Sequence, residues 1–151
     1  MLVVGFALYK GDLIFRCLAQ RLDENPNLDV TLCLDISRRG TDTTKDDDLI
    51  GRYAHDFTAR NWPGQRLPKV YFDPRGLVGD AKTRAVLHAK CVVVDNEKAL
   101  ITSANPTPAA YDRNIELGVV VRGGSIPGEI GGHFASLIEA GLLRPLSLAD
   151  R

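Results

Sequence analysis

Short apolar runs of strand length alternate along this chain with longer segments in which apolar residues recur at helical spacing. The strand-like runs lie at residues 2–8, 28–36, 69–73 and 115–121, and in a hairpin at 85–95 and 98–103 that turns at 96–97. Helical periodicity marks residues 13–22, 45–60 and 128–142. Since several of these strands are apolar at successive positions, helices should cover both of their faces. The order predicts an α/β fold in which a mixed, mostly buried sheet is flanked by helices.

Two segments also predict which side chains face the core. In residues 13–22 the inward positions at helical spacing are Ile14, Phe15, Leu18 and Leu22. In residues 28–36 the alternate positions on one face are Val30, Leu32, Leu34 and Ile36. The helix at 45–60 opens with three aspartates, 46–48, which suit the positive N-terminal end of a helix better than they suit a metal site.

Length and composition predict one domain spanning residues 1–151. Of the 151 residues, 44% are hydrophobic and 25% are charged, the balance of an ordinary soluble globular protein. The 19 basic and 19 acidic residues cancel, so net charge alone gives no reason to expect a nucleic-acid partner. Three cysteines, an odd number, suggest reduced thiols in an intracellular protein rather than a disulfide framework.

The first residues, MLVVGFAL, lack the charged region and the cleavage site of a signal peptide. No run approaches the ~20 apolar residues of a membrane span. We therefore expect a cytoplasmic protein that does not engage a membrane. A strand beginning at Met1 fits a natural minimal domain and a trimmed one equally well.

Polar residues at period two interrupt the apolar pattern of residues 87–105, LHAKCVVVDNEKALITSAN. His88 and Lys90 should share one face of the first hairpin strand, and Ser103 and Asn105 one face at the end of the second. A nucleophile, a cation and hydrogen-bond donors on one face suit an anionic ester. A buried core histidine is the alternative, but it does not explain the other three residues.

The pattern H-x-K-x4-D-x6-T-S-x-N, which begins at His88 and ends at Asn105, resembles the motif of the phospholipase D superfamily. It departs from that motif at Thr102, where the family has glycine. The stretch RNIELGVVV, residues 113–121, resembles the family's following strand, whose acidic residue, here Glu116, faces the histidine. The resemblance implies a phospholipase D-like domain, a phosphohistidine intermediate, no metal and no cofactor. TSAN with RNIELGV is also similar to the phospholipase D-like component of the DISARM antiphage system, which implies a role in defence.

The candidate catalytic residues are His88, Lys90, Asp95, Ser103, Asn105 and Glu116. Imidazole is substantially unprotonated near neutral pH and would attack phosphorus, while Lys90 and Asn105 would bind the non-bridging oxygens. Ser103 adds a hydroxyl beside them, and Glu116 would accept the other imidazole N–H. Asp95, expected at the hairpin turn, suits loop geometry better than substrate contact.

Residues 60–90 contain seven Lys or Arg against two Asp, and this basic segment leads into the candidate site. The candidate substrate-binding residues are Arg66, Lys69, Arg75, Lys82 and Arg84. A basic approach favours a nuclease that holds a DNA or RNA backbone without reading bases, although a solvated basic surface gives the same composition. A phospholipase or phosphatidyltransferase, and a non-catalytic nucleic-acid-binding module, remain open as alternatives on the same fold.

The chain contains one His-x-Lys motif, whereas the family reaction takes two histidines. His55 and His133 have no lysine two residues on and are interpreted as surface or packing residues of helices. We therefore expect a homodimer whose two-fold interface brings His88 of both chains to one phosphate. A monomer whose missing half lies on another protein or on a lost segment is the alternative.

Overall fold

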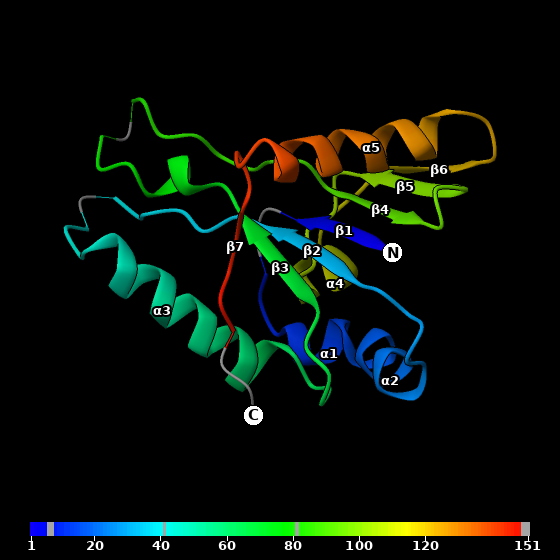
Figure 1. Cartoon of the computed structure of the whole chain (residues 1–151), viewed down its shortest axis with the longest axis horizontal. Coiled ribbons are helices and arrows are strands. Elements are labelled where there is room, and N and C mark those ends of the chain that lie inside the picture. The colour runs from blue at the N-terminus through cyan, green and yellow to red at the C-terminus, as the bar shows by residue number, and fades with distance from the viewer. Residues whose placement is uncertain (6–7, 41, 81, 149–151) are drawn as a thin grey trace.

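The computed structural model describes residues 1–5, 8–40, 42–80 and 82–148, and a seven-stranded sheet runs through this part of the chain (Figure 1). The strand order is β6-β5-β4-β1-β2-β3-β7. The strands are β1 (Leu2–Gly5), β2 (Thr31–Leu34), β3 (Lys69–Phe72), β4 (Cys91–Val94), β5 (Lys98–Thr102), β6 (Gly118–Arg122) and β7 (Arg144–Pro145). Neighbours β1, β2 and β3 are parallel, and the other neighbouring pairs are antiparallel. The predicted α/β fold with a mixed sheet is confirmed.

Helices cover both faces of this sheet (Figure 1). They are α1 (Gly11–Ile14), α2 (Arg16–Glu24), α3 (Asp46–Asp56), α4 (Pro108–Asp112) and α5 (Ile126–Glu139). A π-helical turn at Phe57–Asn61 continues α3, and a 3-10 turn at Pro74–Leu77 follows β3. Helices α1, α2 and α3 pack against β1, β2 and β3 on one face, and α5 packs over β4 and β5 on the other.

The larger core lies between the parallel strands and helices α1 to α3. The side chains predicted to face inward do so: Phe15, Leu22, Val30, Leu32, Leu34 and Ile36 are buried, and Ile14 and Leu18 are partly buried. Trp62 closes this core, with its ring stacked on Phe57 at a centroid distance of 6.1 Å. Its Nε1 donates to the Arg66 carbonyl at 2.8 Å, so the indole is buried without losing its hydrogen bond.

A smaller core lies under α5 and contains Cys33, Cys91 and Phe134. All three cysteines of the chain are free, and Cys17 is exposed. Burial, with a smaller contribution from Cys91, raises the pKa of Cys33 to about 12. The Cys33 thiol is therefore protonated at neutral pH and serves as a packing group.

Three element boundaries differ from the prediction. The strand expected at 85–95 begins only at Cys91, and a three-residue turn at 95–97 follows it, with positive φ at Asp95 (52°) and Asn96 (55°). The helix expected at 13–22 is divided at Phe15 into α1 and α2. Of the strand expected at 2–8, residues 6–7 lie outside the described ranges.

Strand β6 was expected to be buried, and this prediction is wrong. Val119 is 59% exposed and Val120 58% exposed. β6 is the last strand on its side of the sheet, so its outer edge has no neighbouring strand in the described part of the chain. Its apolar sequence reflects a need for cover that the described residues do not meet.

The strand directions define one functional end of the sheet, here called the carboxyl end. It is the end at which Gly5, Leu34 and Phe72 close β1, β2 and β3. Because β4 is antiparallel to β1, with Cys91 opposite Val4, β4 starts at this end. By the same pairing β5 ends there and β6 starts there. Among the described helices, none is both long and apolar enough to cross a membrane.

Candidate active site

His88 and Lys90 lie at the carboxyl end, in the irregular segment that leads into β4 rather than inside a strand as predicted. Hydrogen bonds from two sides hold this segment. The Leu87 N–H donates to Asp35 Oδ1 at 3.0 Å, and the Thr102 N–H donates to the Lys90 carbonyl at 3.1 Å. The segment is thus held between the residue after β2 and the last residue of β5.

The side chains of His88 and Lys90 are in contact. Lys90 Nζ lies 3.3 Å from His88 Nε2 and donates to the His88 carbonyl at 2.8 Å. A lysine ammonium has only hydrogens to offer, so His88 Nε2 accepts in this contact. The nitrogen that must carry a lone pair in a nucleophilic imidazole therefore lies beside a cation that an anionic substrate would attract.

Glu116 is held just before β6 by two side chains. Ser103 Oγ donates to Glu116 Oε2 at 2.5 Å, and Asn114 Nδ2 donates to Oε1 at 2.9 Å. The Ser103 hydroxyl in turn accepts from the Leu117 N–H at 3.1 Å. The hydrogen bond from Ser103, then that from Asn114, and the positive charge of Lys90 lower the pKa of Glu116. The carboxylate is therefore charged and fixed in position at neutral pH.

Thr102, the residue that stands in place of the family's glycine, continues β5 to its end. Its hydroxyl donates to the Leu117 carbonyl at 3.2 Å and accepts from the Ala104 N–H at 3.1 Å. Beyond Asn105, Pro106 packs against β1, because a Cβ atom placed on Gly5 would lie 3.0 Å from the proline ring. The turn that carries Asn105 is therefore anchored on both sides.

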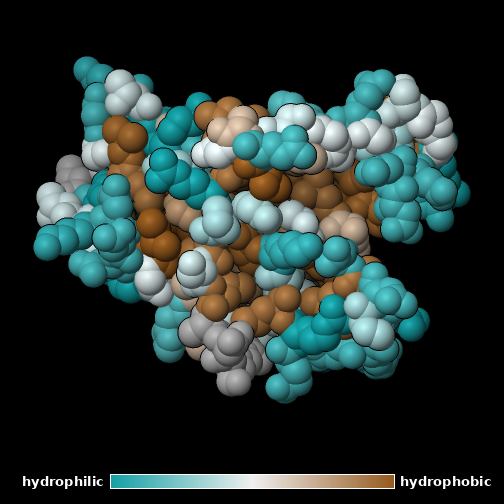
Figure 2. Space-filling model, in the orientation of Figure 1, coloured by the Kyte–Doolittle hydropathy of each residue, from teal (hydrophilic) through white to brown (hydrophobic). Residues whose placement is uncertain are grey.

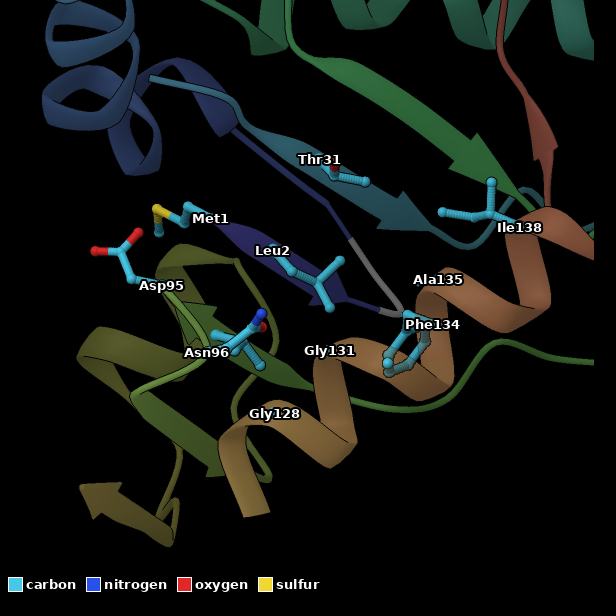
Figure 3. A pocket seen from close by; sticks show the side chains of 12 residues that line it. Met1, Leu2, Thr31, Asp95, Asn96, Gly128, Gly131, Phe134, Ala135 and Ile138 are labelled. Atoms are coloured by element: carbon cyan, nitrogen blue, oxygen red, sulfur yellow. The ribbon is translucent and has the colours of Figure 1, made fainter. Parts of the chain in front are cut away.

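Asp95 lies at the other end of β4 from His88, in the hairpin turn, as expected of a residue that sets loop geometry. It lines a different hollow of about 410 Å³ between α5 and the amino-terminal ends of β1 and β2 (Figure 3). The neighbouring Asn96 approaches the backbone of α5 so closely that a Cβ on Gly131 would lie 2.5 Å from its Oδ1. Figure 2 shows apolar side chains exposed below α5 on this face.

Two further hollows adjoin the candidate site, one on each face of the sheet. The first, of about 370 Å³, lies on the α4 side and has Lys90 and Asn105 among its lining residues, together with apolar side chains of β1, β5 and α2. The second, of about 610 Å³, lies between α5 and the strands β4 and β5 and is here called the α5 groove. Its lining includes His88, Lys90, Ile101, Ile126, Ile130 and His133.

The five predicted basic residues do not form one surface, which corrects the expectation from sequence. Arg66 donates to the Leu22 and Asn25 carbonyls at 2.5 and 2.7 Å and so caps the end of α2. Lys69 pairs with Asp29 at 3.3 Å. Because residue 69 starts β3, both basic residues lie toward the end of the sheet opposite to His88.

The other three basic residues, Arg75, Lys82 and Arg84, lie in loops at the carboxyl end, after β3. Arg75 pairs with the buried Asp73 at 2.7 Å. Burial opposes ionisation of Asp73, but hydrogen bonds from Arg75 outweigh it and lower the pKa of that carboxyl. Arg84 donates to the Val78 and Gly79 carbonyls, and Lys82 is exposed.

The structure adds residues that the sequence interpretation missed. Asp35 and Asn114 position His88 and Glu116 through the hydrogen bonds above, and His133, exposed on α5 as expected, lines the same groove as His88. For Asp35 a signal was present, because polar residues directly after a strand gather at the carboxyl end of an α/β sheet. Within the described ranges, no group of three or more His, Cys, Asp or Glu is placed to hold a metal ion.

Comparison with known proteins places these residues in a family. The model of the family described as "Cardiolipin synthase, PLD-like domain" matches residues 41–138. A DISARM protein DrmC from Bacillus paralicheniformis is 31% identical over 128 residues, which cover 83% of this chain and 45% of that protein. The chain therefore spans about half the length of this curated relative.

Two solved structures share the fold. The crystal structure of Nuc, a phospholipase D family member from Salmonella typhimurium, has a TM-score of 0.58 and 16% identity, covering 97% of this chain and 80% of that one. NucT from Helicobacter pylori has a TM-score of 0.60 and 14% identity, covering 91% and 77%. Since the family model spans most of the sequence, including the His88 motif, this chain belongs to the phospholipase D-like family.

Proposed function

We propose that this chain is a phosphodiesterase, and specifically a metal-independent nuclease, that works through His88. The observation that supports this most directly is the contact between Lys90 Nζ and His88 Nε2 at 3.3 Å. It lies at the end of the sheet where Asn105 and Glu116 are also held. An anionic ester that enters here would meet a cation and a nucleophilic nitrogen together.

In the proposed reaction a phosphate oxygen replaces His88 Nε2 as the partner of Lys90. The Nε2 lone pair forms a bond to phosphorus, the bond to the leaving oxygen breaks, and a second histidine gives its proton to that oxygen. The same histidine then takes a proton from water, the water oxygen attacks phosphorus, and the phosphorus–nitrogen bond breaks. The products are a phosphate monoester and a free hydroxyl, and His88 is regenerated.

Glu116 has a positioning role in this proposal. Ser103 and Asn114 fix its carboxylate, which suits a group that accepts the second imidazole N–H of His88 and stabilises positive charge on the ring. Asn105 supplies amide donors for the non-bridging oxygens. The contact between Glu116 and His88 remains a prediction.

We propose that the second histidine is His88 of another copy, in a homodimer with the site at the two-fold interface. The surface around β6 supports this, since large apolar side chains are exposed next to the site. They are Tyr111, Ile115, Leu117, Val119 and Val120, each at least 58% exposed. Homodimer interfaces are more apolar than the rest of a protein surface, and an outer strand with a free edge readily pairs with another chain.

Mixtures of wild-type and His88→Ala chains, unfolded and reassembled, test the shared site. If each site needs both histidines, activity falls as the square of the wild-type fraction. A linear fall together with a monomeric mass in solution would contradict the dimer and would assign the cover of β6 to a different polypeptide.

We propose nucleic acid as the substrate because Arg75 and Lys82 lie at the carboxyl end with His88. The similarity to a DISARM protein DrmC supports a further proposal, that the chain acts in antiphage defence. Phosphate contacts of this kind release counterions, so binding should weaken steeply with salt. Arg66 and Lys69, at the other end of the sheet, are no longer part of this proposal.

The test is hydrolysis of plasmid, single-stranded DNA, RNA, phosphatidylcholine vesicles and bis(p-nitrophenyl) phosphate in excess EDTA, with His88→Ala as the control. Cleavage of a nucleic acid that survives EDTA and requires His88 supports the proposal. Cleavage of the vesicles alone would assign a phospholipase instead. Salt-sensitive nucleic-acid binding without cleavage of any substrate would assign a binding module. Loss of activity in EDTA, restored by Mg²⁺, would contradict the mechanism.

A further inference from the structure

We propose that the α5 groove binds the nucleobase adjacent to the scissile phosphate and favours bases that carry an amino group. This inference rests on the proposed function and names the part of the substrate that the site recognises. The groove has a volume of about 610 Å³, and His88 and Lys90 are among its lining residues. A phosphate held by these two side chains therefore has one of its ester substituents at the entrance of the groove.

The groove combines an apolar floor with a polar rim. Ile101 of β5 and Ile126 and Ile130 of α5 supply the apolar surface, and Ile101 and Ile126 are 44% and 48% exposed. Glu129 and His133 line the same groove. These two residues are four apart on α5, so they project from one face of the helix.

A nucleobase matches this arrangement because its faces are apolar and its edge carries hydrogen-bond groups. Base stacking on an aromatic ring contributes about 1–3 kcal/mol, and the His133 ring can provide such a surface. That ring makes an edge contact with Phe134 at a centroid distance of 5.4 Å, which restrains it at the groove. An acyl chain would fit the floor, but it would desolvate the Glu129 carboxylate without any compensating hydrogen bond.

The carboxylate also predicts a preference among bases. An ionised glutamate only accepts hydrogen bonds, so it favours the exocyclic amino groups of cytosine and adenine over the carbonyl oxygen at the corresponding position of thymine. Phosphate contacts at Arg75 and Lys82 would be the same for every sequence. Selectivity should therefore depend on the groove and not on the basic loops.

The experiment measures binding rather than turnover, so that it does not depend on catalysis. His88→Ala protein is titrated into fluorescently labelled tetramers of deoxycytidine, thymidine and abasic deoxyribose, which carry the same backbone charge. We expect the deoxycytidine tetramer to bind about tenfold more tightly than the abasic tetramer. Adding His133→Ala should reduce that ratio toward one. Adding Glu129→Gln should remove the preference for deoxycytidine over thymidine.

The matched control is His55→Ala, which removes an exposed histidine from α3 and should leave both ratios unchanged. Equal binding of all three tetramers, no binding of any, or ratios that survive both α5 substitutions would overturn the assignment of the groove. Hydrolysis by the wild-type protein is scored separately in EDTA. Wild-type cleavage with equal tetramer affinities would thus reject the base site while the proposed function stands.

Discussion

The two sides of the sheet have similar apolar strands and opposite environments. In β2, Leu32 and Leu34 are 0% and 1% exposed, because α1 to α3 cover one face and α5 with the smaller core covers the other. In and before β6, Leu117 and Val119 are 79% and 59% exposed. The candidate site lies between these two sides, at the carboxyl end. Apolar composition thus shows that a strand needs cover, but it does not show whether that cover comes from the same chain.

The comparison also separates stability from chemistry. The parallel strands contain the large buried side chains, while β4, β5 and β6 present His88, Asn105 and Glu116 at their ends. If the two sides differ as described, substitutions on one side should change unfolding, and substitutions on the other should change activity or assembly. Four predictions test this division, in order of decreasing effect.

The largest effect is expected for His88→Ala. Removing the nucleophile should lower kcat by more than about 10⁴-fold, as the loss of a nucleophile does in other covalent enzymes. Because His88 is exposed and outside β4, the unfolding midpoint should stay the same. Steady-state hydrolysis and thermal unfolding of one preparation give both values. A variant that retains activity would refute the assignment of His88.

The second prediction concerns the buried side. Leu32→Ala should lower the free energy of unfolding by about 2–5 kcal/mol, because it leaves a cavity beside fully buried neighbours. Chemical denaturation at 25 °C measures this change. Leu13→Ala, at a leucine of α1 that is 51% exposed, is the control and should cost much less. Equal costs for the two variants would show that the sides do not differ in packing.

The third prediction concerns the exposed side. Val119→Lys should convert the dimer to monomers and lower activity about 100-fold, because a charge would be buried where the two copies meet. Sedimentation velocity and hydrolysis rates measure the two effects. Leu13→Lys places the same charge on a different exposed apolar position and should change neither. A wild-type protein that is fully active as a monomer would contradict the shared site.

The smallest effect is expected for Glu116→Gln. It removes a positioning charge rather than a reacting group, so activity should fall by about tenfold. The stability difference between wild type and this variant should also depend on pH. Since folding lowers the pKa of Glu116 below its usual 4.5, its contribution is present above that pH and is lost as the pH falls through the folded value. Denaturation of both proteins between pH 7 and pH 3 measures the loss, and a constant difference would contradict it.

Much of the fold could be predicted from sequence because it depends on local pattern. Period-two burial at Val30, Leu32, Leu34 and Ile36 and the helical spacing around Phe15 both identify core positions correctly. The spacing from His88 to Asn105 also identifies residues that the structure gathers at the carboxyl end. These predictions hold because strand alternation and hairpin pairing bring together residues that are close in sequence.

Other features depend on the tertiary structure. Only the register between β2 and β3 shows that Lys69 starts its strand at the end away from His88, although a compositional count joins the two in one basic segment. Only the strand order leaves Val119 without cover, and only the packing of α5 places His133 in the same groove as His88. The sequence by itself determined which residues can react and which must be buried, because residue chemistry and periodicity are local properties. The tertiary structure decided which of them meet, because contacts between distant segments depend on strand pairing and helix packing across the whole sheet.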